Sequence, residues 1–482
     1  YYPSLKEVKD MNGTFNSAGW TQQSCDGVSR RNFLKIGGLG ATGLTLPELF
    51  KAEAQAGTPR SNKSVIFVWL AGGPPHMETY DMKPEAPSDY RGLFSPIRTN
   101  VPGIDVCELL PMHAKCADKY TLIRSIAHTF NDHGGGSKRF MTGRIPATPT
   151  GTKNDAPSVI SIVNKMRENV DVGLPNCVTM ANGGRSKADT YAQGAAYLGM
   201  KYNSFPVGDD PSSPKFAVRN MFLGKGMEER LSDRRQLLTG LDRIRREVDA
   251  SGAMEAMDEF SHKALDLLTS PRMHEAFDLS KEPQKLRERY GMHAWGQRAL
   301  MARRLVEAGS SFVTVAMENP FISGLKYPKL GFYNWDSHAV NCDLWVDARH
   351  RFPIYDRAIT ALVEDLHNRG LTEEVLLVVT GEFGRSPKIS RADTGRKGLR
   401  HGREHWPQAM SVLVCGGGMQ HGQVVGSTNA KGEHPHDRPL TPNDLWATVY
   451  KHLGIDQNAT INDYSGRPQH LLPFGKPIRE LI

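Results

Sequence analysis

Short runs of consecutive apolar residues recur along the chain and are separated by polar segments that contain glycine. They occupy residues 64–70, 120–126, 173–182, 311–317, 374–380 and 410–415. A run without polar alternation is typical of a strand buried on both faces, as in the middle of a parallel sheet. These runs therefore predict the strands of an α/β fold with a central, mostly parallel sheet.

Several segments between these runs space their apolar residues as helices do. The predicted helices cover 157–168, a segment closing at Ala308, 350–369 and 441–454. The stretch 219–308 as a whole is rich in charged residues at amphipathic spacing, so we expect a helical insertion there with a solvated charged face. Residues 390–403 are polar and basic, and we expect them to form a mobile loop.

Residues 1–56 have the features of a targeting segment rather than of a folded domain. The stretch 29–35, SRRNFLK, matches a twin-arginine export signal, and small-residue cleavage sites follow it. The apolar run 36–46 is too short to remain as a membrane-spanning helix. We therefore expect residues 57–482 to be exported by the twin-arginine machinery to the periplasm or beyond the cell. The alternative is a chance Arg-Arg pair before an apolar run. Because the sequence begins at Tyr1 rather than Met, we expect further residues upstream.

Composition narrows the functional classes. With 482 residues, the chain is long enough for more than one domain or for one large domain with insertions. Its net charge of +8 is dispersed, which favours solubility or an anionic substrate, and no nucleic-acid-binding motif is present. The six cysteines form no CxxC pair, so they fit neither a disulfide scaffold nor a cysteine-rich zinc module.

The stretch 128–144, HTFNDHGGGSKRFMTGR, concentrates the side chains that carry chemistry. Its three glycines would let the backbone approach a ligand closely or adopt positive φ. A helix that begins near Gly136 would offer free amides to an anion, with Lys138, Arg139 and Arg144 adding positive charge. His128 and His133 could converge on a metal if the chain turns between them. The alternative is a glycine-rich surface turn with solvated charges.

Polar residues also follow or precede the predicted strands. In open α/β sheets, ligands bind where the strands end. The candidate residues at such positions are His76, Glu78, Asp81, Asp336, His338, Glu382, Arg385 and His405. Each of them alone also fits a capped turn or an ordinary polar loop.

The order of these segments resembles that of the alkaline phosphatase and sulfatase superfamily. More closely, the chain from residue 57 onward resembles the exported sulfatase-like family called domain of unknown function 1501. The matching segments are GGPPHMETYDMKP (72–84), HTFNDHGGGSKRFMTGR (128–144), NWDSH (334–338), TGEFGRSP (380–387) and the LGID…GRP ending (453–468). The resemblance implies an alkaline phosphatase-like three-layer sandwich. Because fold does not fix function, it implies an activity less specifically.

The superfamily implies a two-metal ester hydrolase with a Ser, Thr or formylglycine nucleophile, and this chain departs from that pattern twice. The nucleophile lies nine residues before the Thr of a Thr-Gly pair, and nine residues before Thr142 stands His133. The Cys-x-Pro-x-Arg pattern of formylglycine sulfatases is absent. Where the superfamily has Asp-His, this chain has Glu382-Phe383, so one imidazole ligand is missing.

We therefore expect two groups of metal ligands with altered membership. His76, His128, His133 and Glu382 would form one group, with Asp81 as a further candidate ligand. The second, more family-like group is Asp336, His338 and His405. Mixed His and carboxylate ligands suit zinc, manganese or iron better than calcium, so we expect one or two divalent ions, zinc or manganese.

The predicted function is hydrolysis of phosphate or sulfate esters on a small molecule or polysaccharide. The nucleophile would be a metal-activated water or His133 itself, through a phospho-histidine intermediate. Arg139, Arg144 or Arg385 would hold the anionic ester. The alternative function is a non-catalytic sulfatase-like scaffold that binds an anionic glycan or a partner at the cell envelope.

Overall fold

The computed structural model describes residues 63–151, 153–181, 194–214, 216, 270–318, 328, 331, 334–393, 395 and 398–482. All of these residues belong to one compact unit, Arg60–Ile482. The predicted export segment within 1–56 and residues 219–269 of the predicted insertion lie outside the described residues. No described helix combines the length and the apolar character that a membrane span requires.

The core of the unit is an eight-stranded sheet in the order β14-β4-β13-β8-β1-β7-β5-β6. Neighbouring strands are parallel, except that β13 runs antiparallel to both β4 and β8. The predicted mostly parallel sheet is therefore confirmed. The strands are β1 (Ser64–Trp69), β4 (Thr121–Ile126), β5 (Cys177–Met180), β6 (Phe205–Val207), β7 (Phe312–Ala316), β8 (Val375–Thr380), β13 (Met410–Gly416) and β14 (Gln423–Val425).

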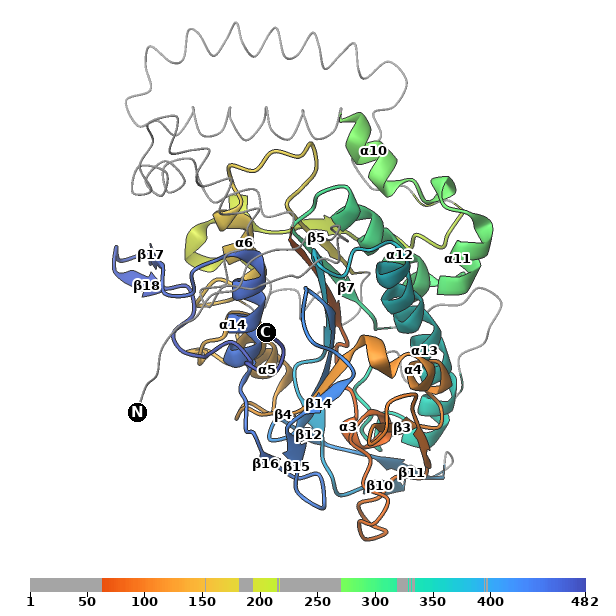
Figure 1. Ribbon diagram of the computed structural model, residues 1–482. Helices are drawn as coiled ribbons and strands as arrows, with labels where there is room; N and C mark the ends of the chain where they lie inside the picture. Colours follow the sequence, from red (N-terminus) through yellow and green to blue (C-terminus); the bar gives the residue numbers. More distant parts are fainter. Residues whose placement is uncertain are drawn as a thin grey trace, which may run out of the picture. The chain divides into compact units, whose positions relative to one another are not determined.

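Helices cover both faces of this sheet, which gives the expected three layers (Figure 1). Alternate residues of β1 face opposite sides, as strand geometry requires. Ile66 and Val68 pack into the cluster that includes residues of α12 (Ala294–Glu307) and α13 (Leu344–Asn368). Phe67 and Trp69 pack with α5 (His133–Thr142), α6 (Val159–Met166) and α14 (Pro442–Leu453). The fold is thus an α/β three-layer sandwich.

Shorter elements complete the described part of the chain. The helices are α3 (His76–Thr79), α4 (Pro111–Lys115), η1 (Ala117–Lys119), η3 (Ala196–Leu198), η4 (Met200–Tyr202), α10 (Pro271–Phe277), η5 (Leu279–Lys281) and α11 (Gln284–Tyr290). The paired short strands are β2 (Pro96–Arg98) with β3 (Asp105–Cys107), β9 (Gly384–Arg385) with β12 (His405–Trp406), β10 (Ser390–Asp393) with β11 (Leu399–Gly402), β15 (Ser427–Thr428) with β16 (Pro435–Asp437), and β17 (Thr460–Asn462) with β18 (Pro468–His470).

Helix α5 begins at His133, three residues before the expected start at Gly136. Asp132 caps it by accepting a 2.7 Å hydrogen bond from the amide of Gly135. None of Gly134, Gly135 and Gly136 has positive φ. A Cβ on Gly136 would lie 2.9 Å from Cδ1 of Phe383, and one on Gly135 would lie 2.5 Å from Oδ2 of Asp132. These glycines therefore serve close packing against protein atoms.

Two other expectations need correction. Helix α12, which we placed at the end of the insertion, packs its buried side chains on the sheet and belongs to the core. The described part of 390–403 is a hairpin, β10–β11, rather than a loop. Its anchor is Arg403, whose side chain is fully buried. The sequence pattern alone could not reveal that Arg403 is buried, because a long charged side chain is buried only where an oppositely charged group pairs with it.

Candidate metal centre

Three histidines converge on Asp336 at the edge of the sheet where β4 and β8 end. His133 opens α5, Asp336 and His338 follow β7, and His405 in β12 precedes β13. Because β13 runs antiparallel to β4 and β8, a residue that precedes β13 lies at the same edge of the sheet as the residues that follow β4 and β8. From Oδ1 of Asp336, the Nε2 atoms of His133, His338 and His405 lie 3.3, 2.9 and 3.1 Å away. The Nε2 atoms of His338 and His405 are 2.8 Å apart.

The other ring nitrogen of each histidine contacts an oxygen acceptor. Nδ1 of His133 lies 2.7 Å from Oε1 of Glu382. Nδ1 of His338 lies 2.5 Å from Oε2 of Glu404. Nδ1 of His405 lies 2.6 Å from the carbonyl oxygen of Asn131. A carboxylate or carbonyl oxygen can only accept, so in each neutral ring the hydrogen resides on Nδ1 and the lone pair on Nε2.

Three nitrogen lone pairs and one carboxylate oxygen therefore face each other in the neutral cluster. Such a set of acceptors repels itself unless a cation or extra protons lie between its members. His133, Asp336 and His405 also offer ligand atoms that all lie within 4.8 Å of one another, which is the spacing of a metal site. A histidine that binds a metal through one ring nitrogen typically donates the N–H of its other ring nitrogen to a carboxylate or a carbonyl oxygen.

Charges in the cluster act strongly on its titrating groups. Burial opposes ionisation of Asp336, but hydrogen bonds from the three histidines and the charge of Arg385 hold the pKa of this carboxyl well below its usual range. Burial also disfavours the charged form of His133, yet the contacts with Asp336 and Glu382 prevail and raise the pKa of His133 to about 9. Burial lowers the pKa of His405, although Asp336 opposes this effect.

Arg385 is fully buried beneath the cluster. Its Nη2 donates to Oδ1 of Asp336 at 2.6 Å and also to the carbonyl oxygen of Gly72. Its other nitrogens donate to the carbonyl oxygens of Gly73 at 3.0 Å and of Arg403 at 3.1 Å. This guanidinium therefore positions Asp336, and its donors are already engaged by the protein.

The remaining predicted ligands lie nearby with other partners. His76 is buried and its Nε2 lies 3.0 Å from the carbonyl oxygen of Gly432. His128 binds main-chain atoms through both nitrogens, including the carbonyl oxygen of Glu382 at 2.6 Å. Asp81 pairs with Lys83 at 2.9 Å. Glu382 reaches the cluster through His133, and its Oε2 has no hydrogen-bond partner among the described residues.

The two other predicted substrate-binding arginines have partners of their own. Arg139 donates to Oδ1 of Asn443 at 2.8 Å and lies over the ring of Phe474. Arg144 follows the opposite end of α5 and donates to the carbonyl oxygen of His470. Of the three arginines, only Arg385 touches the described cluster, and it does so through Asp336.

The structure adds Glu404 and Asn131, which the sequence did not single out, and gives the candidate residue Glu78 a structural partner. Glu404 orients His338. Because Glu404 directly precedes the candidate ligand His405, the sequence could have indicated that Glu404 lies near the site. Asn131 contributes through its backbone, which no sequence pattern reveals. Glu78, placed near the site by its position after β1, forms a fully buried ion pair with Arg403, with Oε1 2.6 Å from Nη2. This pair fixes the end of the β10–β11 hairpin against α3.

Comparisons with known proteins agree with the resemblance seen in the sequence. The family model described as "Protein of unknown function (DUF1501)" matches residues 62–482. A search of curated proteins finds no match.

Solved structures with a similar chain path are distant in sequence. A phosphonate monoester hydrolase from Silicibacter pomeroyi aligns with 86% of this chain and 76% of its own, at 11% identity and a TM-score of 0.39. A sulfatase from Pseudoalteromonas sp. covers 87% and 72%, at 15% identity and a TM-score of 0.33. TAB5 alkaline phosphatase covers 83% and 99%, at 11% identity and a TM-score of 0.33. Similarity at this level says nothing about what this chain binds.

Proposed function

The chain belongs to the DUF1501 family, and we propose that it is an exported, metal-dependent hydrolase of phosphate or sulfate esters. The observation that carries the proposal is the meeting of three Nε2 atoms with Oδ1 of Asp336. Their geometry and chemistry fit a divalent cation better than any arrangement of hydrogen bonds among neutral rings.

The core of the ligand set we propose is His133, Asp336 and His405, whose ligand atoms lie within 4.8 Å of one another. His338, whose Nε2 lies 2.9 Å from Oδ1 of Asp336, completes the set around one ion. Three imidazoles and one carboxylate suit zinc or manganese. In this proposal His133, expected in the first group of ligands, joins the second group, because its Nε2 lies 3.3 Å from Oδ1 of Asp336. His76, His128 and Asp81 bind other groups, so we propose no second ion.

Access from solvent favours a reactive site over a purely structural one. The side chains of His133, His338 and His405 are 17%, 16% and 19% exposed. Structural metal sites are usually closed, whereas catalytic sites keep a position open for water or substrate. A divalent ion held here would polarise an ester oxygen and lower the pKa of water to near neutrality. Around it, Glu382 and Glu404 orient two of the imidazoles, and Arg385 holds Asp336.

His133 remains a second candidate nucleophile, because its Nε2 carries a lone pair when Nδ1 donates to Glu382. The geometry favours the ligand role instead. Nε2 of His133 lies 3.3 Å from Oδ1 of Asp336, and this negative charge would repel an anionic ester approaching the ring. We therefore assign His133 to the metal.

The substrate class and the cellular location rest on the sequence. The net charge of +8 favours an anionic substrate. The twin-arginine pattern at 29–35 supports export to the periplasm or beyond the cell. A small anionic ester and an ester on a polysaccharide both fit these features.

One observation favours a second function, that of a metal-holding scaffold without hydrolysis. The three arginines expected to bind the ester all have protein partners: Arg139 binds Asn443, Arg144 binds His470, and Arg385 binds Asp336. A metal site that no free guanidinium reaches would stabilise an anionic transition state less well than one with such a group. The scaffold would still bind the ion through the same four ligands.

The test is metal content combined with turnover. Protein purified without chelators is analysed by elemental mass spectrometry, and hydrolysis of p-nitrophenyl phosphate and p-nitrophenyl sulfate is followed. We expect about one zinc or manganese ion per chain and a turnover that a chelator abolishes and metal restores. Asp336→Ala and His405→Ala should lose both the ion and the turnover, whereas His436→Ala, at an exposed histidine of β16, should lose neither.

The outcomes separate the two functions. A bound ion without turnover of either ester would select the scaffold. Absence of metal from protein reconstituted with zinc and with manganese would reject both functions. Retention of full turnover in His405→Ala would show that hydrolysis occurs elsewhere in the chain.

A further inference from the structure

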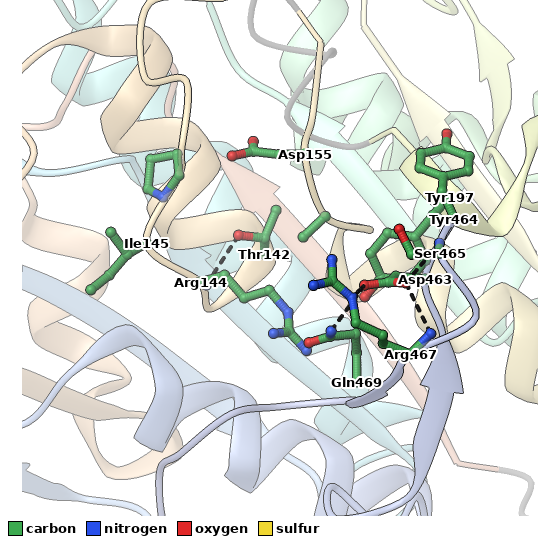
Figure 2. A pocket seen from close by; sticks show the side chains of 12 residues that line it. Thr142, Arg144, Ile145, Asp155, Tyr197, Asp463, Tyr464, Ser465, Arg467 and Gln469 are labelled. Atoms are coloured by element: carbon green, nitrogen blue, oxygen red, sulfur yellow. Dashed lines mark hydrogen bonds and ion pairs between the residues drawn. The ribbon is translucent and has the colours of Figure 1, made fainter.

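A polar pocket of about 340 Å³ lies at the end of α5 opposite to His133 (Figure 2). Helix α5 separates its first residue, His133, from Thr142 in the pocket wall by about 14 Å, at 1.5 Å per residue. The wall also includes the β17–β18 hairpin. The lining residues include Thr142, Arg144, Tyr197, Tyr464, Arg467 and Gln469. None of them belongs to the metal cluster, so the pocket is a separate site.

Two guanidinium groups from different parts of the chain reach this pocket. Arg144 follows α5, and Arg467 belongs to the β17–β18 hairpin. Figure 2 shows both side chains extending into the space beside Gln469. Nε of Arg144 is buried and has no hydrogen-bond partner among the described residues. Such a buried, unsatisfied donor of a cation is well suited to an anionic ligand.

The carboxylates of the pocket are already engaged by the protein. Asp463 accepts hydrogen bonds from the amide of Ser465 at 2.8 Å and from that of Arg467 at 3.1 Å. It also pairs with Nε of Arg467 at 3.2 Å, and the side chain of Arg467 is 74% exposed. Asp155 accepts from the amide of Thr148 at 3.3 Å. Nε2 of Gln469 also donates to Oδ2 of Asp463 at 3.1 Å. Arg467 thus offsets the charge of Asp463, whereas Asp155 keeps its negative charge and Arg144 is the cation of the pocket that pairs with a backbone carbonyl rather than a carboxylate.

Two tyrosines form one corner of the pocket. The ring centroids of Tyr197 and Tyr464 are 6.1 Å apart, with an angle of 81° between the ring planes. Tyr464 is 82% exposed although it is a large aromatic residue. A flat, exposed ring of this kind can cover the apolar C–H face of a sugar ring while its hydroxyl remains in water.

We propose that this pocket binds an acidic saccharide unit, a sugar ring that carries a carboxylate or a sulfate. The anionic group would pair with Arg144 and Arg467, and the sugar ring would stack on Tyr464. The side-chain carbonyl oxygen of Gln469, whose Nε2 donates to Asp463, and the hydroxyl of Ser465 would bind sugar hydroxyls. A volume of about 340 Å³ lies at the lower end of the range for small-molecule sites. The inference is independent of the proposed hydrolase, because the pocket shares no residue with the metal cluster.

The test is titration calorimetry of the whole chain at low ionic strength. The probe is a chondroitin sulfate tetrasaccharide, which carries both carboxylate and sulfate groups. Uncharged maltotetraose and sodium sulfate alone are the controls for the sugar ring and for the anion. We expect binding of the acidic probe that weakens as salt is added, with at least tenfold weaker binding of either control. Equal affinity for maltotetraose or for sulfate alone would overturn the proposal, as would failure to bind the acidic probe.

Matched variants locate the binding. Tyr464→Ala and Arg144→Gln should each weaken binding about tenfold, the size expected for a lost charged hydrogen bond or aromatic contact. Tyr464→Phe should bind nearly as the wild type, because it keeps the ring. Arg479→Gln removes a side chain that is 83% exposed outside the pocket and should change affinity less than twofold.

Folding and metal content serve as checks on the variants. Tyr464 is so exposed that its replacement leaves the core untouched, so Tyr464→Ala tests the pocket even if Arg144→Gln unfolds. The metal content of Tyr464→Ala should equal that of the wild type. Wild-type affinity in Tyr464→Ala together with wild-type affinity in a folded Arg144→Gln would show that the saccharide binds elsewhere.

Discussion

Glu382, two residues after β8, is joined to His133, the first residue of α5, by a hydrogen bond of 2.7 Å between Oε1 and Nδ1. The same oxygen accepts the amide of Gly72 at 2.8 Å, so the carboxylate is held from two sides. This contact connects three segments that are distant in sequence. It also keeps the hydrogen of His133 on Nδ1, which directs the Nε2 lone pair at Asp336.

Glu382→Gln should weaken metal binding about tenfold, because second ligand-sphere partners of metal-bound histidines are typically worth 10- to 100-fold in affinity. Glutamine keeps the shape of the side chain but removes its negative charge. The measurement is a competition titration with a chromophoric chelator. Glu85→Gln, at an exposed position, is the matched control and should bind as the wild type. Equal affinities of both variants would exclude a role for Glu382 in the metal site.

Metal uptake should depend on pH through His133. In the metal-free protein the pKa of this residue is raised to about 9, so a proton competes with the ion at lower pH. Apparent affinity should rise by up to about tenfold per pH unit between pH 6.5 and 9 and level off above that. The same shift means that His133 stabilises the metal-free fold below pH 6.5 and that this stabilisation is lost as pH rises through about 9.

Chelator competition at pH 6.5, 7.5 and 8.5 checks this dependence. Glu382→Gln should show a flatter profile, because it loses one of the contacts that raise the pKa of His133. An affinity for metal that is constant from pH 6.5 to 8.5 in the wild type would contradict the assignment of His133 as a ligand.

The sequence predicted much of the sheet but not the arrangement of its strands. The apolar runs at β1, β8 and β13 identify buried strands by composition alone, and the structure confirms them. The reversal of β13 leaves no local signal, because it depends on pairing with β4 and β8. That reversal brings His405, which precedes its strand, to the edge where β8 ends. Nor does the sequence show that His133, which follows β4, meets the expected group of Asp336, His338 and His405, because this contact also depends on the order of the strands.

Gly136→Ala should disturb the metal site although alanine favours helices. The added Cβ would lie 2.9 Å from Cδ1 of Phe383 and 3.3 Å from the carbonyl oxygen of Phe130. The gain in helix propensity is about 1 kcal/mol, whereas overpacking a tight contact costs about 1–3 kcal/mol. The net effect should be a lower melting temperature and weaker metal binding, because the first turn of α5 carries His133.

A second substitution tests the cause. Phe383→Leu combined with Gly136→Ala gives the new methyl group room and should recover part of both losses. Scanning calorimetry and chelator competition are the readouts. If the double variant is no better than Gly136→Ala alone, the clash with Phe383 is not the origin of the effect.

The buried pair of Glu78 and Arg403 should be a strong determinant of stability near the site. Both side chains are fully buried, and burial raises the pKa of Glu78 even though Arg403 opposes that shift. Glu78→Gln would leave the guanidinium buried without its counter-charge, so we expect a loss of about 3–5 kcal/mol in the free energy of unfolding.

Chemical denaturation measures the free energy of unfolding that Glu78→Gln loses. Arg391 of the same hairpin forms an exposed pair with Asp89, with 3.8 Å between the charged atoms, and Asp89→Asn should change stability by less than about 1 kcal/mol. Replacing both Glu78 and Arg403 by methionine should cost less than Glu78→Gln alone, because no unpaired charge remains. A loss in Glu78→Gln no larger than that in Asp89→Asn would mean that Arg403 finds other acceptors, and the hairpin would then be held by the main-chain contacts of Arg403 rather than by the ion pair.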